Sequence, residues 1–84
     1  MEELRKEIDE CDKTIVNALI KRFEVVKKIG EYKKKNNLPI VDKSREKKVY
    51  EKIENLSSGK ISFEILKNIY SVIIQSAVNL EEDK

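Results

Sequence analysis

The side chains that could do chemistry in this chain are arginines, lysines and carboxylates, because the sequence contains no histidine. Its one cysteine, Cys11, lies on an apolar helical stripe, where a small core residue is expected. Metal sites and catalysis based on histidine are therefore largely excluded. If the protein is an enzyme, its reaction must depend on Arg, Lys, Asp and Glu.

Two cations stand out by their spacing. Arg22 interrupts an otherwise apolar stripe, and Lys33 follows it by three helical turns, so both side chains leave nearly the same face about 16 Å apart at Cα. They could converge on a small anion, although an Arg on such a stripe can equally pair with a carboxylate of its own chain. Arg5 points about 100° away and lies roughly 25 Å from Arg22, so it could reach such a site only from an antiparallel second copy.

Other charged residues lie near predicted helix ends. Asp42 and the two charged residues Arg45 and Glu46 open the second predicted helix, where a capping residue with first-turn charges is the simplest interpretation. Glu81 follows Ala77 by four residues and extends the apolar stripe of the third predicted helix. A carboxylate there is either solvated at the end of the chain or directed into a cavity, and the pattern alone favours the former.

Three helices are predicted to position these residues. Their ranges are about 3–37, 42–55 and 63–82, with Asp42 and Ser62 as N-caps. Along the first, apolar residues recur at alternating spacings of four and three. We call this stripe the seam, and it consists of Leu4, Ile8, Cys11, Ile15, Ala18, Arg22, Val25, Ile29 and Tyr32.

The first predicted helix is too long for a small monomer. About 35 helical residues span roughly 52 Å, whereas a compact domain of 84 residues is roughly 30 Å across. Several turns of the seam would then be left in water. We therefore expect an all-α chain with a single domain, residues 1–84, that forms a homodimer.

Composition narrows the possible partners. The 18 basic and 16 acidic residues are interspersed and give a net charge of +2. Nucleic-acid-binding proteins usually gather basic residues on one face, and the one basic run, residues 33–35, fits the end of a helix. No apolar run approaches a membrane span, and the N-terminus does not resemble a signal peptide. We expect a cytoplasmic protein that binds neither nucleic acid nor membrane.

Three motifs, in this order and at this spacing, resemble the all-helical chorismate mutases over residues 4–82. They are Leu4-Arg5-x-x-Ile8-Asp9-x-x-Asp12-x-x-Ile15-x-x-Leu19-Ile20-x-Arg22, Gly30-Glu31-Tyr32-Lys33, and Pro39-Ile40-x-Asp42-x-x-Arg45-Glu46. The resemblance implies a long, a short and a medium helix per chain in an intertwined homodimer. It also implies the Claisen rearrangement of chorismate to prephenate, a pericyclic reaction that needs no metal or cofactor.

The resemblance also implies roles for individual residues. Arg22 and the partner chain's Arg5 would bind the two substrate carboxylates, since a guanidinium can donate two parallel hydrogen bonds to a carboxylate. Lys33 would donate to the ether oxygen, on which negative charge develops. Glu46 would accept a hydrogen bond from the ring hydroxyl, with help from the backbone at Asp42.

The remaining implied site residues are Arg45, Ala77 and Glu81. Arg45 would line the pocket, and Ala77 stands where many family members carry Ser, so one polar contact is expected to be missing. Glu81 stands where many carry Gln, and a carboxyl group can donate a hydrogen bond only when it is protonated. We therefore expect burial to keep Glu81 protonated and activity to fall as pH rises. The short loop at 57–61 leaves Asn79 or Glu82 as alternatives for this position.

Two other functions fit the same residues. An isochorismate-pyruvate lyase of the same fold would share the Arg and Lys architecture, and a product assay separates it from a mutase. A non-catalytic helical docking module would use Arg5, Arg22, Lys33 and Glu46 as surface or pairing residues. In that case a hydrophobic residue in place of Arg22 should stabilise the protein without loss of function.

Overall fold

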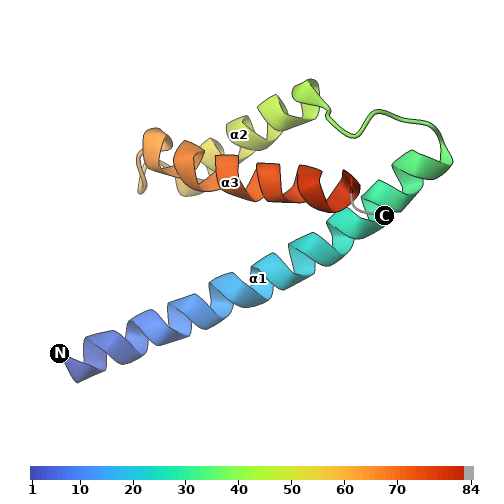
Figure 1. Ribbon diagram of the computed structural model, residues 1–84. Coiled ribbons are helices and arrows are strands. Elements are labelled where there is room, and N and C mark those ends of the chain that lie inside the picture. The colour runs from blue at the N-terminus through green and yellow to red at the C-terminus, as the bar shows by residue number, and fades with distance from the viewer. Residues whose placement is uncertain (83–84) are drawn as a thin grey trace.

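A computed structural model describes residues 1–82 and consists of three α-helices (Figure 1). They are α1 (Glu2–Lys35), α2 (Lys43–Ser57) and α3 (Phe63–Glu82). The described part contains no strand. The all-α prediction and the order long, short, medium are confirmed, and each predicted helix end is correct to within one turn.

Two asparagines, Asn36 and Asn37, follow the last turn of α1. Asn37 adopts a left-handed conformation with φ of 54°. The backbone N–H of Leu38 donates to the carbonyl of Lys33 at 2.8 Å, and that of Asn37 donates to the carbonyl of Lys34 at 3.4 Å. This is the Schellman pattern, which satisfies carbonyls that the last helical turn leaves unpaired.

The two later helices begin at the predicted caps. The Asp42 carboxylate accepts from the backbone N–H of Arg45 at 3.0 Å, and the Ser62 hydroxyl oxygen accepts from the backbone N–H of Ile65 at 3.2 Å. Each bond satisfies one N–H that the first helical turn leaves unpaired. The side chains at the start of α2 are thereby fixed relative to the connection from α1.

The long first helix sets the shape of the chain, whose principal dimensions are 52 × 25 × 15 Å. α2 runs back along α1, and α3 then runs in the same general direction as α1 (Figure 1). α3 packs against both other helices. α1 and α3 meet near the end of α3 and diverge towards the N-terminus of α1, so that half of α1 stands apart.

Few apolar side chains are buried in the single chain. The buried ones are Val26, Ile53, Leu66 and Ala77. The exposed area is 7119 Å², whereas a compact monomer of 9.8 kDa exposes about 5200 Å². Seam residues such as Ile8 (59% exposed) and Ile15 (55%) account for part of the excess. Cys11 is exposed as well, so its prediction as a core residue is wrong for the single chain.

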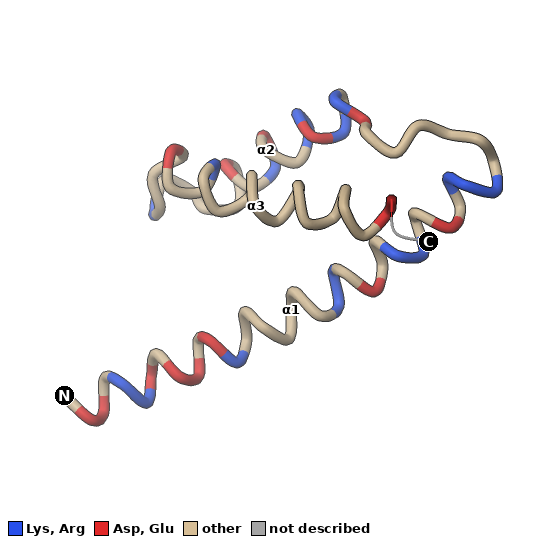
Figure 2. Tube along the Cα trace, in the orientation of Figure 1, with Lys and Arg blue, Asp and Glu red and all other residues tan. Residues whose placement is uncertain are grey.

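Charged residues are unevenly distributed along the helices. Lys, Arg, Asp and Glu crowd the first turns of α1 and most of α2, whereas residues 14–20 and 68–80 contain none of them (Figure 2). Within the uncharged stretch of α3, Ile69 and Val72 are 51% and 66% exposed. None of the described helices is long and apolar enough to cross a membrane.

Candidate active site

A cavity of about 430 Å³ opens between the C-terminal half of α1, the start of α2 and the end of α3. This volume is within the usual range for small-molecule sites. Apolar side chains make up about half of the wall, and charged ones make up the rest. The lining residues are Arg22, Val25, Val26, Ile29, Lys33, Ile40, Asp42, Arg45, Glu46, Val49, Ile74, Val78 and Glu81.

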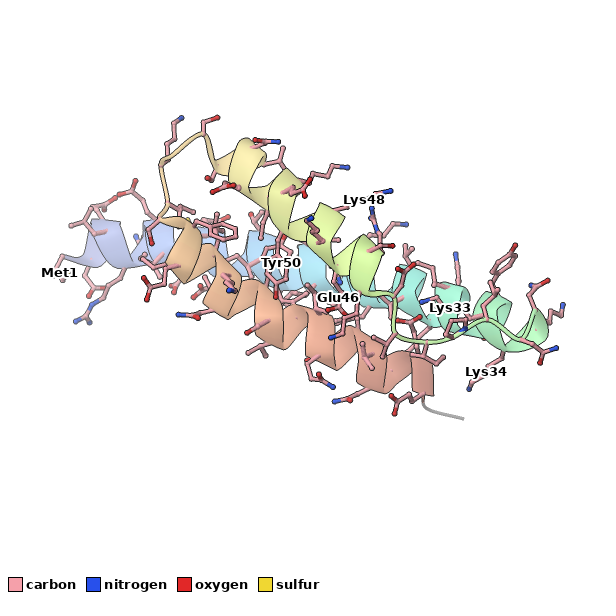
Figure 3. All side chains as sticks on the ribbon, turned by 90° about the horizontal axis from the view of Figure 1, so that it is seen from above. Met1, Lys33, Lys34, Glu46, Lys48 and Tyr50 are labelled. Carbon is pink, nitrogen blue, oxygen red and sulfur yellow. The ribbon has the colours of Figure 1, made fainter. Side chains whose placement is uncertain are left out.

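Lys33 connects three elements at one end of the cavity. Its Nζ donates to the backbone carbonyl of Ile40 at 2.8 Å and lies 2.8 Å from Oε1 of Glu81. The Lys33 side chain is 18% exposed, and its ammonium has a third N–H for a ligand. Figure 3 shows Lys33 beside the connection to α2, whereas the side chain of Lys34 points away from it.

Glu81 is the buried carboxylate of the site. The residue is 8% exposed, and its Oε1 accepts no hydrogen bond within residues 1–82 apart from the ion-pair contact with Lys33. The last turn of α3 holds it there, because Ala77, one turn earlier, is buried too. The burial of Glu81 agrees with what the family resemblance implies, whereas the residue pattern alone favours a solvated carboxylate. The pairing of Glu81 with Lys33 was not predicted.

The start of α2 brings two carboxylates to the cavity. The backbone N–H of Arg45 lowers the pKa of Asp42, with smaller effects in the same direction from the Ser44 hydroxyl and the charge of Lys33. Glu46 has a distant partner in Lys43, whose Nζ is 3.7 Å from Oε1 and largely exposed. Such a pair contributes little, so the Glu46 carboxylate retains acceptor capacity towards the cavity.

An aromatic ring accompanies Arg22. The guanidinium carbon lies 6.0 Å from the ring centroid of Tyr70 on α3. At this distance the negative face of a ring attracts a cation weakly. Both residues are partly buried, so the ring restricts where the guanidinium can lie.

The formal charges of the cavity cancel in the single chain. Three cations and three carboxylates line it, namely Arg22, Lys33, Arg45, Asp42, Glu46 and Glu81. A dianionic ligand would therefore meet no net attraction from these groups alone. A further cation, or a proton on one carboxylate, would shift the balance in favour of such a ligand.

Comparison with known proteins shows to which family the chain belongs. Residues 4–82 match the family described as chorismate mutase type II. The chain belongs to this family.

The relatives described here are all longer than this type II chain. It is 42% identical over 86 residues to the bifunctional chorismate mutase/prephenate dehydratase of Aquifex aeolicus, covering 98% of this chain and 24% of the relative. The corresponding enzyme of Buchnera aphidicola subsp. Schizaphis graminum is 40% identical over 75 residues, covering 88% of this chain and 20% of the relative. The chain thus spans about a quarter or less of these two proteins. No solved structure gives a significant match.

Another relative is named for a single activity. The chorismate mutase of Methanocaldococcus jannaschii is 39% identical over 54 residues, which cover 64% of this chain and 54% of the relative. This chain is thus similar to proteins with and without a second enzymatic activity in their names.

Two of the predicted site residues do not line the cavity of this type II chain. Arg5 lies near the start of α1, and its exposed side chain is 3.8 Å from Glu2. Ala77 is buried, but it is not part of the cavity wall. The other six predicted residues lie together, and their individual roles remain predictions.

The alternatives to Glu81 lie on another face. Asn79 and Glu82 are exposed and border a separate depression beside Phe23. The Asn79 side-chain oxygen accepts from Nε2 of Gln75 at 3.1 Å. Of the three candidates, Glu81 is the one that lines the cavity.

The sequence does not predict the contacts of two residues beside the cavity. Tyr70 contacts Arg22, and the signal that could have found this contact is its ring and hydroxyl among aliphatic neighbours. Gly30 belongs to the second motif, which does not indicate that this residue lies against Glu81. Within residues 1–82, no group of three or more His, Cys, Asp or Glu side chains is arranged to hold a metal ion.

Proposed function

We propose that this chain catalyses the rearrangement of chorismate to prephenate. The observation that carries the proposal is the cavity that Arg22, Lys33 and Arg45 line together, in a chain of the chorismate mutase type II family. The reaction breaks one C–O bond and forms one C–C bond within the same molecule. It therefore requires conformational restraint and charge stabilisation rather than a nucleophile.

The apolar wall of the cavity supplies the conformational restraint, and the cations supply the charge stabilisation. Side chains such as Val26 and Ile74 enclose the substrate in a compact conformer, which removes much of the entropic barrier. Arg22 binds a substrate carboxylate, and Lys33 donates its third N–H to the ether oxygen as the C–O bond breaks. A fixed donor at that oxygen stabilises the transition state more than the ground state.

The start of α2 orients the ring of the substrate. Glu46 accepts from the ring hydroxyl with support from the Asp42 backbone, and Arg45 adds positive charge nearby. The Asp42 cap supports this arrangement because it fixes the first turn of α2 against the connection that also carries Ile40.

A second copy of the chain completes the site in an intertwined homodimer. The exposed area exceeds that of a compact monomer by about 1900 Å², enough for a stable homodimer interface. Arg5, about 25 Å from Arg22 along α1, reaches the partner's cavity when two copies pair antiparallel. Its charge would add the attraction for a dianion that one chain lacks.

Glu81 positions the Lys33 ammonium in the proposed site. Its Oε1 lies 2.8 Å from Nζ, so this carboxylate and the carbonyl of Ile40 together fix the direction of the remaining N–H. The substitution Glu81→Gln keeps the size of the side chain but removes its charge, so it tests whether the ion pair or a side-chain donor serves the reaction.

The decisive experiment follows the loss of chorismate absorbance from mildly acidic to mildly basic pH and identifies the product. Prephenate formation supports the mutase, and its dependence on pH tests the donor role that the sequence predicts for Glu81. Pyruvate released from isochorismate would instead indicate the lyase. No turnover with either substrate would leave a helical docking module, and Arg22→Leu should then raise the melting temperature without loss of function.

We further propose that residues 1–84 form a single domain. We also propose that the protein serves aromatic amino-acid biosynthesis and that it is located in the cytoplasm. The relatives named chorismate mutase/prephenate dehydratase support the pathway. A single folded species in gel filtration of the purified chain would support the single domain. Cell fractionation tests the compartment.

A further inference from the structure

Gly30 is buried in α1, one turn before Lys33, where Glu81 near the end of α3 approaches it. Its backbone is helical, so no positive φ demands a glycine here. Within a helix, glycine is less favourable than almost any other residue because it loses the most backbone freedom. The local conformation therefore gives no reason for glycine at this position.

The close approach of α3 gives the reason. A Cβ at position 30 would lie 3.0 Å from the Cα of Glu81, and 3.3 Å from both its Cβ and its Cγ. These distances are a few tenths of an ångström shorter than ordinary van der Waals contact. Because the nearest atom belongs to the backbone, a rotamer change of Glu81 cannot relieve the overlap. The last turn of α3 would have to move.

We infer that Gly30 is a positioning residue, which sets the separation of α3 from α1 and thereby places the Glu81 carboxylate on Lys33. The inference rests on the proposed function, since it assigns Gly30 a role through these two residues. Oε1 of Glu81 and Nζ of Lys33 are 2.8 Å apart and cannot come closer, and both side chains are mostly buried. A shift of α3 therefore changes where the Lys33 ammonium lies in the cavity.

The catalytic consequence follows from the sensitivity of fixed donors to distance. A misplacement of about 1 Å can cost roughly a hundredfold in rate, so a shift of a few tenths of an ångström should cost roughly tenfold. The loss should appear in kcat, because the Lys33 donor acts on charge that develops in the transition state. Substrate binding through Arg22 should change little, so KM should stay within about threefold of its original value.

The test is a double-mutant cycle with Gly30→Ala and Glu81→Ala. Gly30→Ala alone should lower kcat roughly tenfold. If Gly30 acts through Glu81, the same substitution in the Glu81→Ala background should cost less than about twofold, because coupled residues are not additive. The control is Lys28→Ala, an exposed position on the same helix, which should leave kcat unchanged.

Two outcomes would overturn the inference. One is an unchanged kcat in Gly30→Ala, with the higher melting temperature that alanine gives when it meets no neighbour. The other is an equal loss of kcat in both backgrounds, which would indicate a general effect on folding. Because the overlap is small, we expect Gly30→Ala to fold, which circular dichroism checks.

A second measurement separates this inference from the proposed function. The ¹³C resonance of the Glu81 carboxyl, assigned with Glu81→Gln, should move in Gly30→Ala and stay in place in Lys28→Ala. If the wild-type chain shows no mutase activity, the proposed function fails while this resonance still tests the position of Glu81. An unmoved resonance in Gly30→Ala would refute the positioning role whatever the activity.

Discussion

The two halves of α1 carry the same apolar periodicity but have different surroundings in the single chain. In the C-terminal half, α3 buries Val26 and Gly30 and a cavity forms around Lys33. In the N-terminal half, Leu4 and Ile8 are each 59% exposed. The 20 residues of α3 span about 30 Å and cannot cover the 34 residues of α1, which span about 51 Å. The apolar seam thus predicts that these residues are covered, but it does not predict whether the same chain or a second copy covers them.

The largest effect should come from the cavity half. Lys33→Ala removes the proposed donor to the ether oxygen and leaves Glu81 buried without its cation. Loss of one such donor typically costs roughly 10²–10³ in kcat. The matched control is Lys34→Ala, which removes the same charge from a side chain outside the cavity and should stay within about twofold. Equal losses in both variants would contradict the assignment of Lys33.

The second prediction links the two halves through a partner chain. Arg5→Ala and Arg22→Ala should each lower kcat/KM roughly a hundredfold, because each removes a carboxylate ligand. A heterodimer of the two variants has one site with both arginines and one with neither. After unfolding and refolding together in equal amounts, the mixture should regain about a quarter of wild-type activity by random pairing. No recovery would show that Arg5 does not act across the dimer.

The third prediction concerns dimerisation through the N-terminal half of α1. Ile15→Glu places a carboxylate on the seam, and burying it without a partner should weaken dimerisation roughly a hundredfold or more. Sedimentation at several concentrations measures the effect. Lys13→Gln makes the same change in net charge off the seam and should leave the dimer intact. A mass unaffected by Ile15→Glu would mean that another surface pairs the chains.

The elements of the fold were predictable because their signals are local. Asp42 and Ser62 each lie where a side-chain oxygen can reach the N–H three residues on, and the Asn36–Asn37 pair suits a left-handed ending. The spacing of Arg22 and Lys33 likewise fixed their common face. These features depend on helical geometry within a few turns, so a single sequence contains them.

The contacts within the site were less predictable because they join distant segments. The approach of Glu81 to Gly30 and Lys33 depends on how α3 packs on α1, which periodicity does not determine. For Cys11, in contrast, the periodicity predicted a contact that the single chain does not make. Its place on the seam predicted burial, but the covering surface is absent from the single chain.

A smaller effect should come from the ring beside Arg22. Tyr70→Leu removes the cation–π contact, worth about 0.5–1 kcal/mol, so KM should rise roughly two- to fivefold. Tyr70→Phe keeps the ring face and should leave KM near the wild-type value. Steady-state kinetics of both variants measure this. A similar rise in both would assign the effect to the hydroxyl instead of the ring.

The smallest effect concerns the cap that positions the α2 side of the cavity. The backbone N–H of Arg45 lowers the pKa of Asp42 in the folded chain, so ionised Asp42 stabilises the fold above its ordinary pKa of about 3.8. This contribution is lost as pH falls through the lowered, folded-state value. Asp42→Asn still caps the helix but does not titrate. Wild type should therefore be slightly more stable than Asp42→Asn near neutral pH, and urea unfolding should show the difference vanish in acid. A difference that is independent of pH would mean that the amide simply caps less well and that the charge of Asp42 adds nothing to the stability of the fold.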